Sequence, residues 1–129
     1  MDVVIVSARQ WDELAKEGKI DPAVRTVVAR VGIGVFVKRG SPKPQIATVD
    51  DFKRELLKAR TIALGDPGNG SPVGAFAMGL FERLGIRSEV EPKLRLIKGL
   101  PIGAVASGEA ELGLAQISEI LPATDVELV

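Results

Sequence analysis

Residues Thr61–Gly85, TIALGDPGNGSPVGAFAMGLFERLG, predict a strand, a glycine-rich turn and a helix in immediate succession. The short apolar run Thr61–Leu64 has the length of a buried strand. The next six residues contain three glycines and a proline, so they form a loop. Ser71 is suited to cap the helix, and Pro72 is tolerated at its first position, where an N–H would have no partner. We therefore expect a helix whose first turn no large side chain covers.

The start of this helix is a candidate anion site. The N–H groups of Val73 and Gly74 lack partners within the helix, and the Ser71 hydroxyl lies beside them in the sequence. Such helix starts bind anions. The alternative is a tight turn whose glycines only satisfy the backbone geometry. The loop is neither a Walker A motif, since no Gly-Lys-Ser/Thr follows, nor a dinucleotide fingerprint, so a small ion is favoured over a nucleotide.

The composition excludes several functions. Seventeen basic residues balance seventeen acidic ones among 129, which disfavours a nucleic-acid partner. The chain has no Cys and no His, so disulfides, thiol nucleophiles and Ser-His triads are excluded. Asp66 could act as a base or bind a metal, but we expect it to form an Asx turn with its own loop. The other carboxylates are scattered. We therefore expect no enzymatic activity, no metal and no cofactor.

Strands and helices alternate along the chain, which predicts an α/β fold with a mostly parallel sheet of about five strands flanked by helices. We expect the strands at Val3–Val6, in one or two pieces within Val24–Val37, and at Thr61–Leu64, Lys93–Ile97, Glu111–Ala115 and Val126–Val129. We expect the helices at Trp11–Glu17, Val49–Ala59, Pro72–Leu84, Ile102–Ser107 and Gln116–Leu121, with Thr48 and Asp51 capping the second.

Ligands of such sheets bind at the carboxyl ends of the strands. Three loops follow an expected strand and precede an expected helix: Gly65–Ser71, Lys98–Pro101 and Gln116–Ser118. The first two contain glycine, which opens the backbone to close approach. Gln116 and Ser118 offer neutral polar groups, with a capped turn as the alternative role. A site of hydroxyl and N–H groups can select a dehydrated oxyanion without a counter-charge.

Four segments together resemble the molybdate-binding proteins of ABC importers, which are periplasmic solute-binding proteins of the type 2 fold. These segments are DVVIVSA (2–8), VGIGVFVKRGSPKP (31–44), IALGDPGNGSPVGAFA (62–77) and GEAELGLAQISEI (108–120). The resemblance covers essentially all 129 residues. It implies two α/β lobes joined by crossover strands, with the oxyanion in the cleft between them. Residues 1–129 resemble the second lobe alone, with crossover strands at 1–8 and 122–129 and the first lobe largely absent.

The resemblance also implies particular ligand contacts. Val73 takes the position of a backbone-amide ligand at the helix start, and Lys98 or its neighbour Gly99 takes that of a second. Gln116 stands where the family often has a tyrosine whose hydroxyl contacts the ion, which is a departure from the family pattern. The candidate ligand-binding residues are Ser71, Val73, Gly74, Lys98, Gly99 and Gln116.

The function implied by the resemblance is capture of a small oxyanion, such as molybdate or tungstate, in the periplasm for the membrane subunits of an ABC importer. Because one lobe supplies only part of the contacts, we expect weak or no binding by this chain. Exposed strand edges at Val3–Val6 and Val126–Val129 favour a homodimer. The alternative is an interaction module that uses the same lobe for self-association and binds no ligand.

Overall fold

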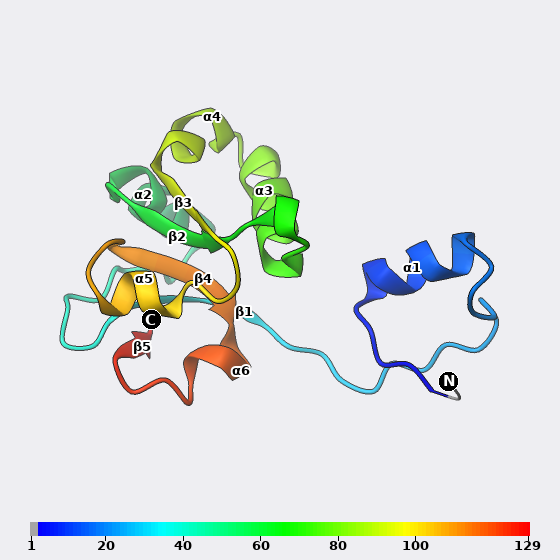
Figure 1. Cartoon of the computed structure of the whole chain (residues 1–129). Coiled ribbons are helices and arrows are strands. Elements are labelled where there is room, and N and C mark those ends of the chain that lie inside the picture. Colours follow the sequence, from blue (N-terminus) through cyan, green and yellow to red (C-terminus); the bar gives the residue numbers. More distant parts are fainter. Residues whose placement is uncertain (1–2) are drawn as a thin grey trace. The chain divides into compact units, whose positions relative to one another are not determined.

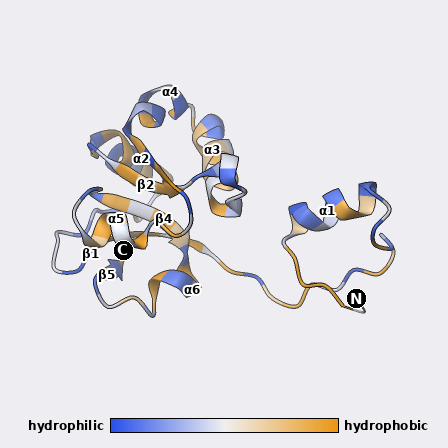
Figure 2. Ribbon diagram, in the orientation of Figure 1, coloured by the Kyte–Doolittle hydropathy of each residue, from blue (hydrophilic) through white to orange (hydrophobic). Residues whose placement is uncertain are grey.

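The structure, a computed structural model, describes residues 3–129 in two units, residues 3–30 and Val31–Val129 (Figure 1). The first unit contains α1 (Ala8–Lys16), where Ser7 and Gln10 form a capping box. This confirms the expected helix, with a start three residues earlier than Trp11. The strands expected at Val3–Val6 and Val24–Ala29 were wrong: both segments are extended chain without strand pairing in the described residues. Both are apolar (Figure 2) yet largely exposed, since no neighbouring strand in this unit buries them.

The second unit contains a five-stranded sheet, in the order β3-β2-β4-β1-β5. The strands are β1 (Ile33–Lys38), β2 (Ile62–Gly65), β3 (Leu94–Ile97), β4 (Leu112–Gln116) and β5 (Val126–Leu128). Strand β2 pairs in parallel with β3 and β4, whereas β1 runs antiparallel to both β4 and β5. The α/β class and the five strands are confirmed. The sheet is mixed, however: four strands share one direction and β1 opposes them. A buried antiparallel strand is as continuously apolar as a parallel one, so the sequence did not reveal this reversal.

Helices cover the sheet. The four that were expected in this unit begin and end close to the expected residues, whereas the short helix at Arg87–Val90 was not expected. The helices are α2 (Val49–Lys58), α3 (Pro72–Arg83), α4 (Arg87–Val90), α5 (Ile102–Ala106) and α6 (Ile117–Ile120), with 3₁₀ turns η1 (Pro67–Asn69) and η2 (Glu91–Lys93). No helix within residues 3–129 is long and apolar enough to cross a membrane.

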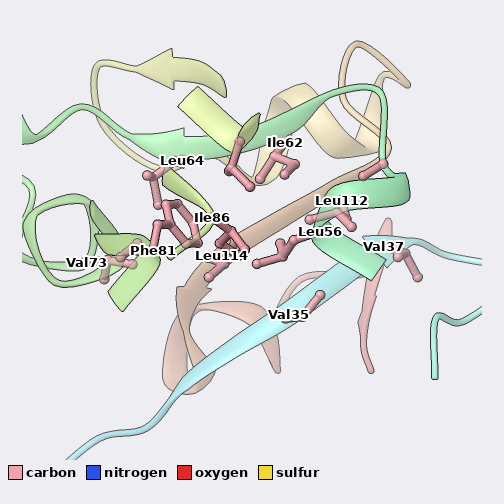
Figure 3. Packing of buried hydrophobic residues seen from close by; sticks show 13 residues of the cluster. Val35, Val37, Leu56, Ile62, Leu64, Val73, Phe81, Ile86, Leu112 and Leu114 are labelled. Carbon is pink, nitrogen blue, oxygen red and sulfur yellow. The ribbon is translucent and has the colours of Figure 1, made fainter. Parts of the chain in front are cut away.

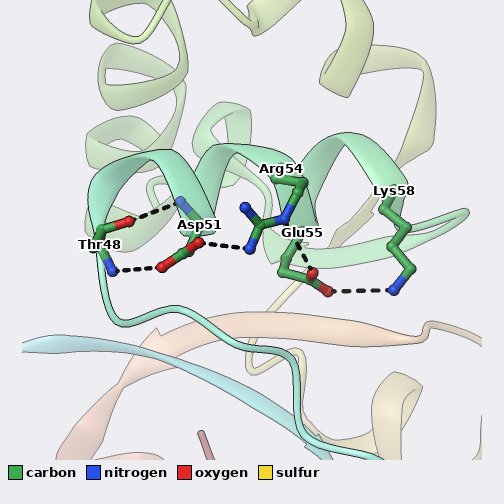
Figure 4. Close-up of polar contacts among 5 residues, drawn as sticks. All are labelled: Thr48, Asp51, Arg54, Glu55 and Lys58. Atoms are coloured by element: carbon green, nitrogen blue, oxygen red, sulfur yellow. Dashed lines mark hydrogen bonds and ion pairs between the residues drawn. The ribbon is translucent and has the colours of Figure 1, made fainter.

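The capping box expected at the start of α2 is present (Figure 4). The Asp51 N–H donates to the Thr48 hydroxyl over 3.1 Å, and the Thr48 N–H donates to the Asp51 carboxylate over 3.2 Å. The hydrogen bond from the Thr48 side chain, together with one from Arg54, lowers the pKa of Asp51. Because Asp51 is ionised and paired at neutral pH, it anchors the first turn of α2.

Alternate residues along the strands belong to two separate hydrophobic clusters, one on each face of the sheet. Val35 and Val37 of β1 belong to the first cluster, which also contains Phe81 from α3 (Figure 3). Phe36 belongs to the second, where it packs with Val105 from α5. Both faces are therefore covered, and the strand ends are the places left for a ligand.

Helix α3 is held against the end of β2 by direct contact between backbones. A Cβ added at Gly74 would fall deep inside van der Waals contact with the Gly65 carbonyl oxygen and 3.0 Å from the Pro67 nitrogen. A Cβ at Gly65 would in turn collide with the Ser71 hydroxyl. Both positions therefore require glycine, and the pair sets the first turn of α3 directly over the end of β2.

Replacing Gly74 tests this contact. We expect Gly74→Ala to lower the free energy of unfolding by about 1–3 kcal/mol, because the added methyl group forces helix and strand apart. Urea denaturation measures the change. Gly79→Ala in the same helix is the matched control, since its Cβ would meet only the flexible end of Arg83 at 3.5 Å. That variant should gain roughly 0.5–1 kcal/mol from helix propensity. A Gly74→Ala variant as stable as Gly79→Ala would contradict the tight contact.

Candidate functional site

A hollow of about 210 Å³ lies at the carboxyl ends of β2, β3 and β4. Each of the three loops expected to carry a site contributes to its wall, through Gly65–Ser71, Gly99–Pro101 and Gln116. The structure thus brings together segments that are up to 51 residues apart, counting from Gly65 to Gln116. Ser71, Val73, Gly99 and Gln116 line the hollow, whereas Gly74 and Lys98 do not.

The start of α3 lines the hollow through Ser71, Pro72 and Val73, and it has one unpartnered N–H group. The Ser71 hydroxyl accepts a hydrogen bond from the Gly74 N–H over 3.1 Å, so Gly74 is already occupied. Pro72 has no N–H. The Val73 N–H has no protein partner in the part of the chain that the structure describes. Of the two N–H groups expected at this helix start, Val73 is therefore the available one, and Gly74 serves the cap and the packing on Gly65.

The loop before α3 satisfies its own carboxylate. Asp66 accepts a hydrogen bond from the Gly68 N–H over 2.8 Å, and its second oxygen accepts one from the Asn69 side chain. This confirms the expected Asx turn. Gly70 then takes a left-handed conformation, with φ of 82°, which directs the chain into Ser71. Asp66 lines the hollow, but both of its oxygens are engaged within the loop.

The turn between β3 and α5 supplies two further N–H groups. Gly99 has φ of 103°, a conformation that side chains rarely tolerate, and it lines the hollow together with Leu100. Neither N–H has a hydrogen-bond partner within residues 3–129. The Lys98 side chain is exposed. Between the two alternatives expected for this turn, Gly99 is the residue at the hollow.

A capped turn follows β4. A Glu119 carboxylate oxygen accepts a hydrogen bond from the Gln116 N–H over 3.2 Å. The capped-turn role considered for Gln116 is therefore present. Glu119, which was not expected at the site, is half-buried and lines the hollow. Its spacing of three from Gln116 was the signal that places it on the turn directly after the strand.

The charges around the hollow are unusual for an anion site. Two carboxylates, Asp66 and Glu119, contribute to its wall, and no Lys or Arg of the described chain does. A bound anion would instead accept hydrogen bonds from the N–H groups of Val73, Gly99 and Leu100. Among residues 3–129, no group of three or more Asp and Glu side chains is placed to hold a metal ion.

A second hollow, of about 650 Å³, contains basic residues. Its wall includes Lys38, Lys58, Arg60 and Glu111. Arg60 forms an ion pair with Glu111, whose pKa is lowered mainly by a hydrogen bond from the Arg60 N–H and further by the guanidinium. This pairing offsets one of the positive charges, and Gly108 is the one glycine of residues 3–129 in the wall of this hollow, whereas Gly65, Gly70 and Gly99 line the first.

Comparisons with known proteins place this geometry in context. A family model described as bacterial extracellular solute-binding protein matches residues 1–129. An aconitate isomerase from Pseudomonas sp. is 33% identical over 129 residues, which is 99% of this chain and 48% of that protein. The chain thus spans about half the length of this curated relative.

Two solved structures share the fold. One is described as the substrate binding domain of a molybdenum ABC transporter from Clostridium difficile, with a TM-score of 0.71 and 18% identity over 95% of this chain and 52% of that one. The other is the BenM effector binding domain with its effector benzoate, with a TM-score of 0.60 and 20% identity over 96% of this chain and 60% of that one. At these identities the likeness concerns the fold alone.

Proposed function

This chain belongs to the family of bacterial extracellular solute-binding proteins, and from that premise we propose that its hollow at the strand ends captures a small anion. The observation that carries the proposal is that three residues with unpartnered N–H groups line one hollow. Val73 at the start of α3 and Gly99 and Leu100 after β3 line the same hollow without partners within the described chain. Such groups, aided by the positive end of a twelve-residue helix, can replace the water around an anion.

The part of the site that lies on this chain is small. Its volume of about 210 Å³ is below the roughly 300–1,000 Å³ of sites for drug-sized ligands. This favours a small solute, for which there are two candidate chemical classes. One is an oxyanion such as molybdate or tungstate, as expected from the sequence. The other is a small carboxylate, which the relative named for aconitate supports.

In this proposal the solute is delivered to the membrane subunits of an ABC importer, and the protein acts in the periplasm. The description of the family as extracellular supports the location. The chain acts as one lobe, and a second lobe completes the enclosure of the solute. The relative of about twice the length supports this arrangement.

A second candidate function is isomerisation of a small carboxylate at the same hollow. The observation in its favour is the 33% identity to an aconitate isomerase. Glu119 is the carboxylate at the hollow that could exchange a proton with a bound substrate. The chain has no His and no Cys to share that task, so we rank capture first.

The proposal also includes self-association. Strand β5 is an edge of the sheet, and unpaired edges add strands from other chains. In the first unit Val3, Ile5 and Val28 are exposed at 77%, 79% and 72%. Apolar extended segments of this kind favour burial against another copy.

Binding at the hollow is measurable residue by residue. Titration of the ¹⁵N-labelled chain with phosphate, molybdate and cis-aconitate should shift the amide signals of Val73, Gly99 and Leu100 for at least one of them. The turn at Gly108, which does not line the hollow, is the internal control. We expect a dissociation constant weaker than micromolar, because one lobe encloses the solute only in part. A submicromolar constant, or shifts at Gly108 without shifts at Val73, would contradict this account.

Capture and isomerisation differ in what happens to the ligand. If the chain only binds, cis-aconitate incubated with it should remain unchanged in its ¹H spectrum. Turnover that Glu119→Gln abolishes would instead establish the isomerase.

Self-association predicts a concentration-dependent molar mass. Light scattering should give a value approaching twice 13.7 kDa, and charge introduced by Val28→Lys should lower it. A strictly monomeric mass at high concentration would argue against the dimer.

A further inference from the structure

Glu119 differs from the other groups of the hollow because it can only accept hydrogen bonds. It lies on the first turn of α6, and one carboxylate oxygen accepts from the Gln116 N–H over 3.2 Å. The hydrogen bond from Gln116 is the one that this carboxylate accepts within residues 3–129, and it leaves the other oxygen without a protein partner. Val73 and Gly99, whose N–H groups lack partners, line the same hollow. The wall of one small space therefore combines residues with free donors and a residue with a free acceptor.

Asp66, the second carboxylate at the hollow, has no oxygen left without a hydrogen-bond partner. Asp66 accepts from both the Gly68 N–H and the Asn69 side chain, so its two oxygens are engaged within the loop. No Lys or Arg of the described chain lines the hollow to compensate Glu119. The acceptor that a ligand meets is thus Glu119.

An ionised carboxylate repels an anion that has no O–H group but can accept a hydrogen bond from an anion that has one. A fully ionised oxyanion has only acceptor oxygens, so contact with Glu119 opposes two negative charges and leaves both groups without a donor. An anion that retains an O–H group donates it to the carboxylate and gains a charge-assisted hydrogen bond. Sites built for a donor can reject analogues that lack it by large factors.

We propose that Glu119 makes the hollow selective for anions that retain a hydrogen-bond donor. In this inference, which rests on the proposed anion capture, the solute is a hydroxy acid or a partly protonated acid. Bare oxyanions such as sulfate and molybdate are then poor ligands. The N–H groups of Val73 and Gly99 bind the charged end of the solute, and Glu119 accepts from its O–H.

Phosphate and sulfate provide the test. At a pH where phosphate carries two charges and one proton, the two ions match in charge and shape and differ in the donor. We measure both dissociation constants from the Val73 amide shift of the whole chain. The unmodified protein should bind phosphate at least about tenfold more tightly than sulfate.

Three variants isolate the carboxylate. Glu119→Gln can retain the capping geometry, since capping boxes accept Glu or Gln at this position. Its amide can also donate to sulfate, so the preference for phosphate should fall to within about threefold. Glu119→Asp keeps the charge and should keep the preference. Glu109→Gln makes the same chemical change at an exposed residue outside the hollow and should leave it unchanged.

The outcomes separate this inference from the function on which it rests. Equal binding of phosphate and sulfate, or a preference that persists in Glu119→Gln, would overturn the role of Glu119 while leaving anion capture intact. If neither ion shifts the Val73 amide at any concentration, the inference fails, and anion capture fails with it if molybdate and cis-aconitate also leave that amide unshifted.

Discussion

The contact between the backbones of Gly65 and Gly74 is the constraint on which the site depends. It sets the first turn of α3 over the end of β2 at a separation that any side chain would prevent. The Ser71 hydroxyl then caps the Gly74 N–H. Because Gly74 is occupied and Pro72 has no N–H, the Val73 N–H is the one that this turn offers to the hollow. Two glycines and a proline thus leave this turn with a single free donor.

The parallel pairing of three strands brings two further turns to the start of α3. Strands β3 and β4 flank β2 in the same direction, so the turns after all three strands meet at one edge of the sheet. The turn after β3 brings the N–H groups of Gly99 and Leu100, and the turn after β4 brings Glu119. The walls therefore differ chemically, with donors on two turns and an acceptor on the third. A solute that matches both walls is favoured over one that is simply negative.

Local signals in the sequence were sufficient for much of this architecture. Ser71 and Pro72 predicted the start of α3, and Thr48 with Asp51 predicted that of α2, because caps depend on neighbours three residues apart. The three loops at the hollow followed from the alternation of strands and helices. The sequence did not reveal features that depend on contacts between residues far apart in the chain. The reversed β1 has the apolar run of any buried strand, and Val3–Val6 has strand composition but no partner in its unit. Glu119 was missed because a glutamate on a short helix usually faces water.

A bound anion that contains a heavy atom can be located in crystals of this chain. Arsenate has the shape of phosphate and retains one O–H, and its arsenic atom is identified by anomalous scattering. After soaking with arsenate, we expect the anomalous peak of arsenic in the hollow at the strand ends, with arsenate oxygens within hydrogen-bond distance of the Val73 and Gly99 N–H groups and the arsenate O–H donating to the Glu119 carboxylate. A peak in the hollow lined by Lys38 and Arg60, with none beside Val73, would contradict this expectation.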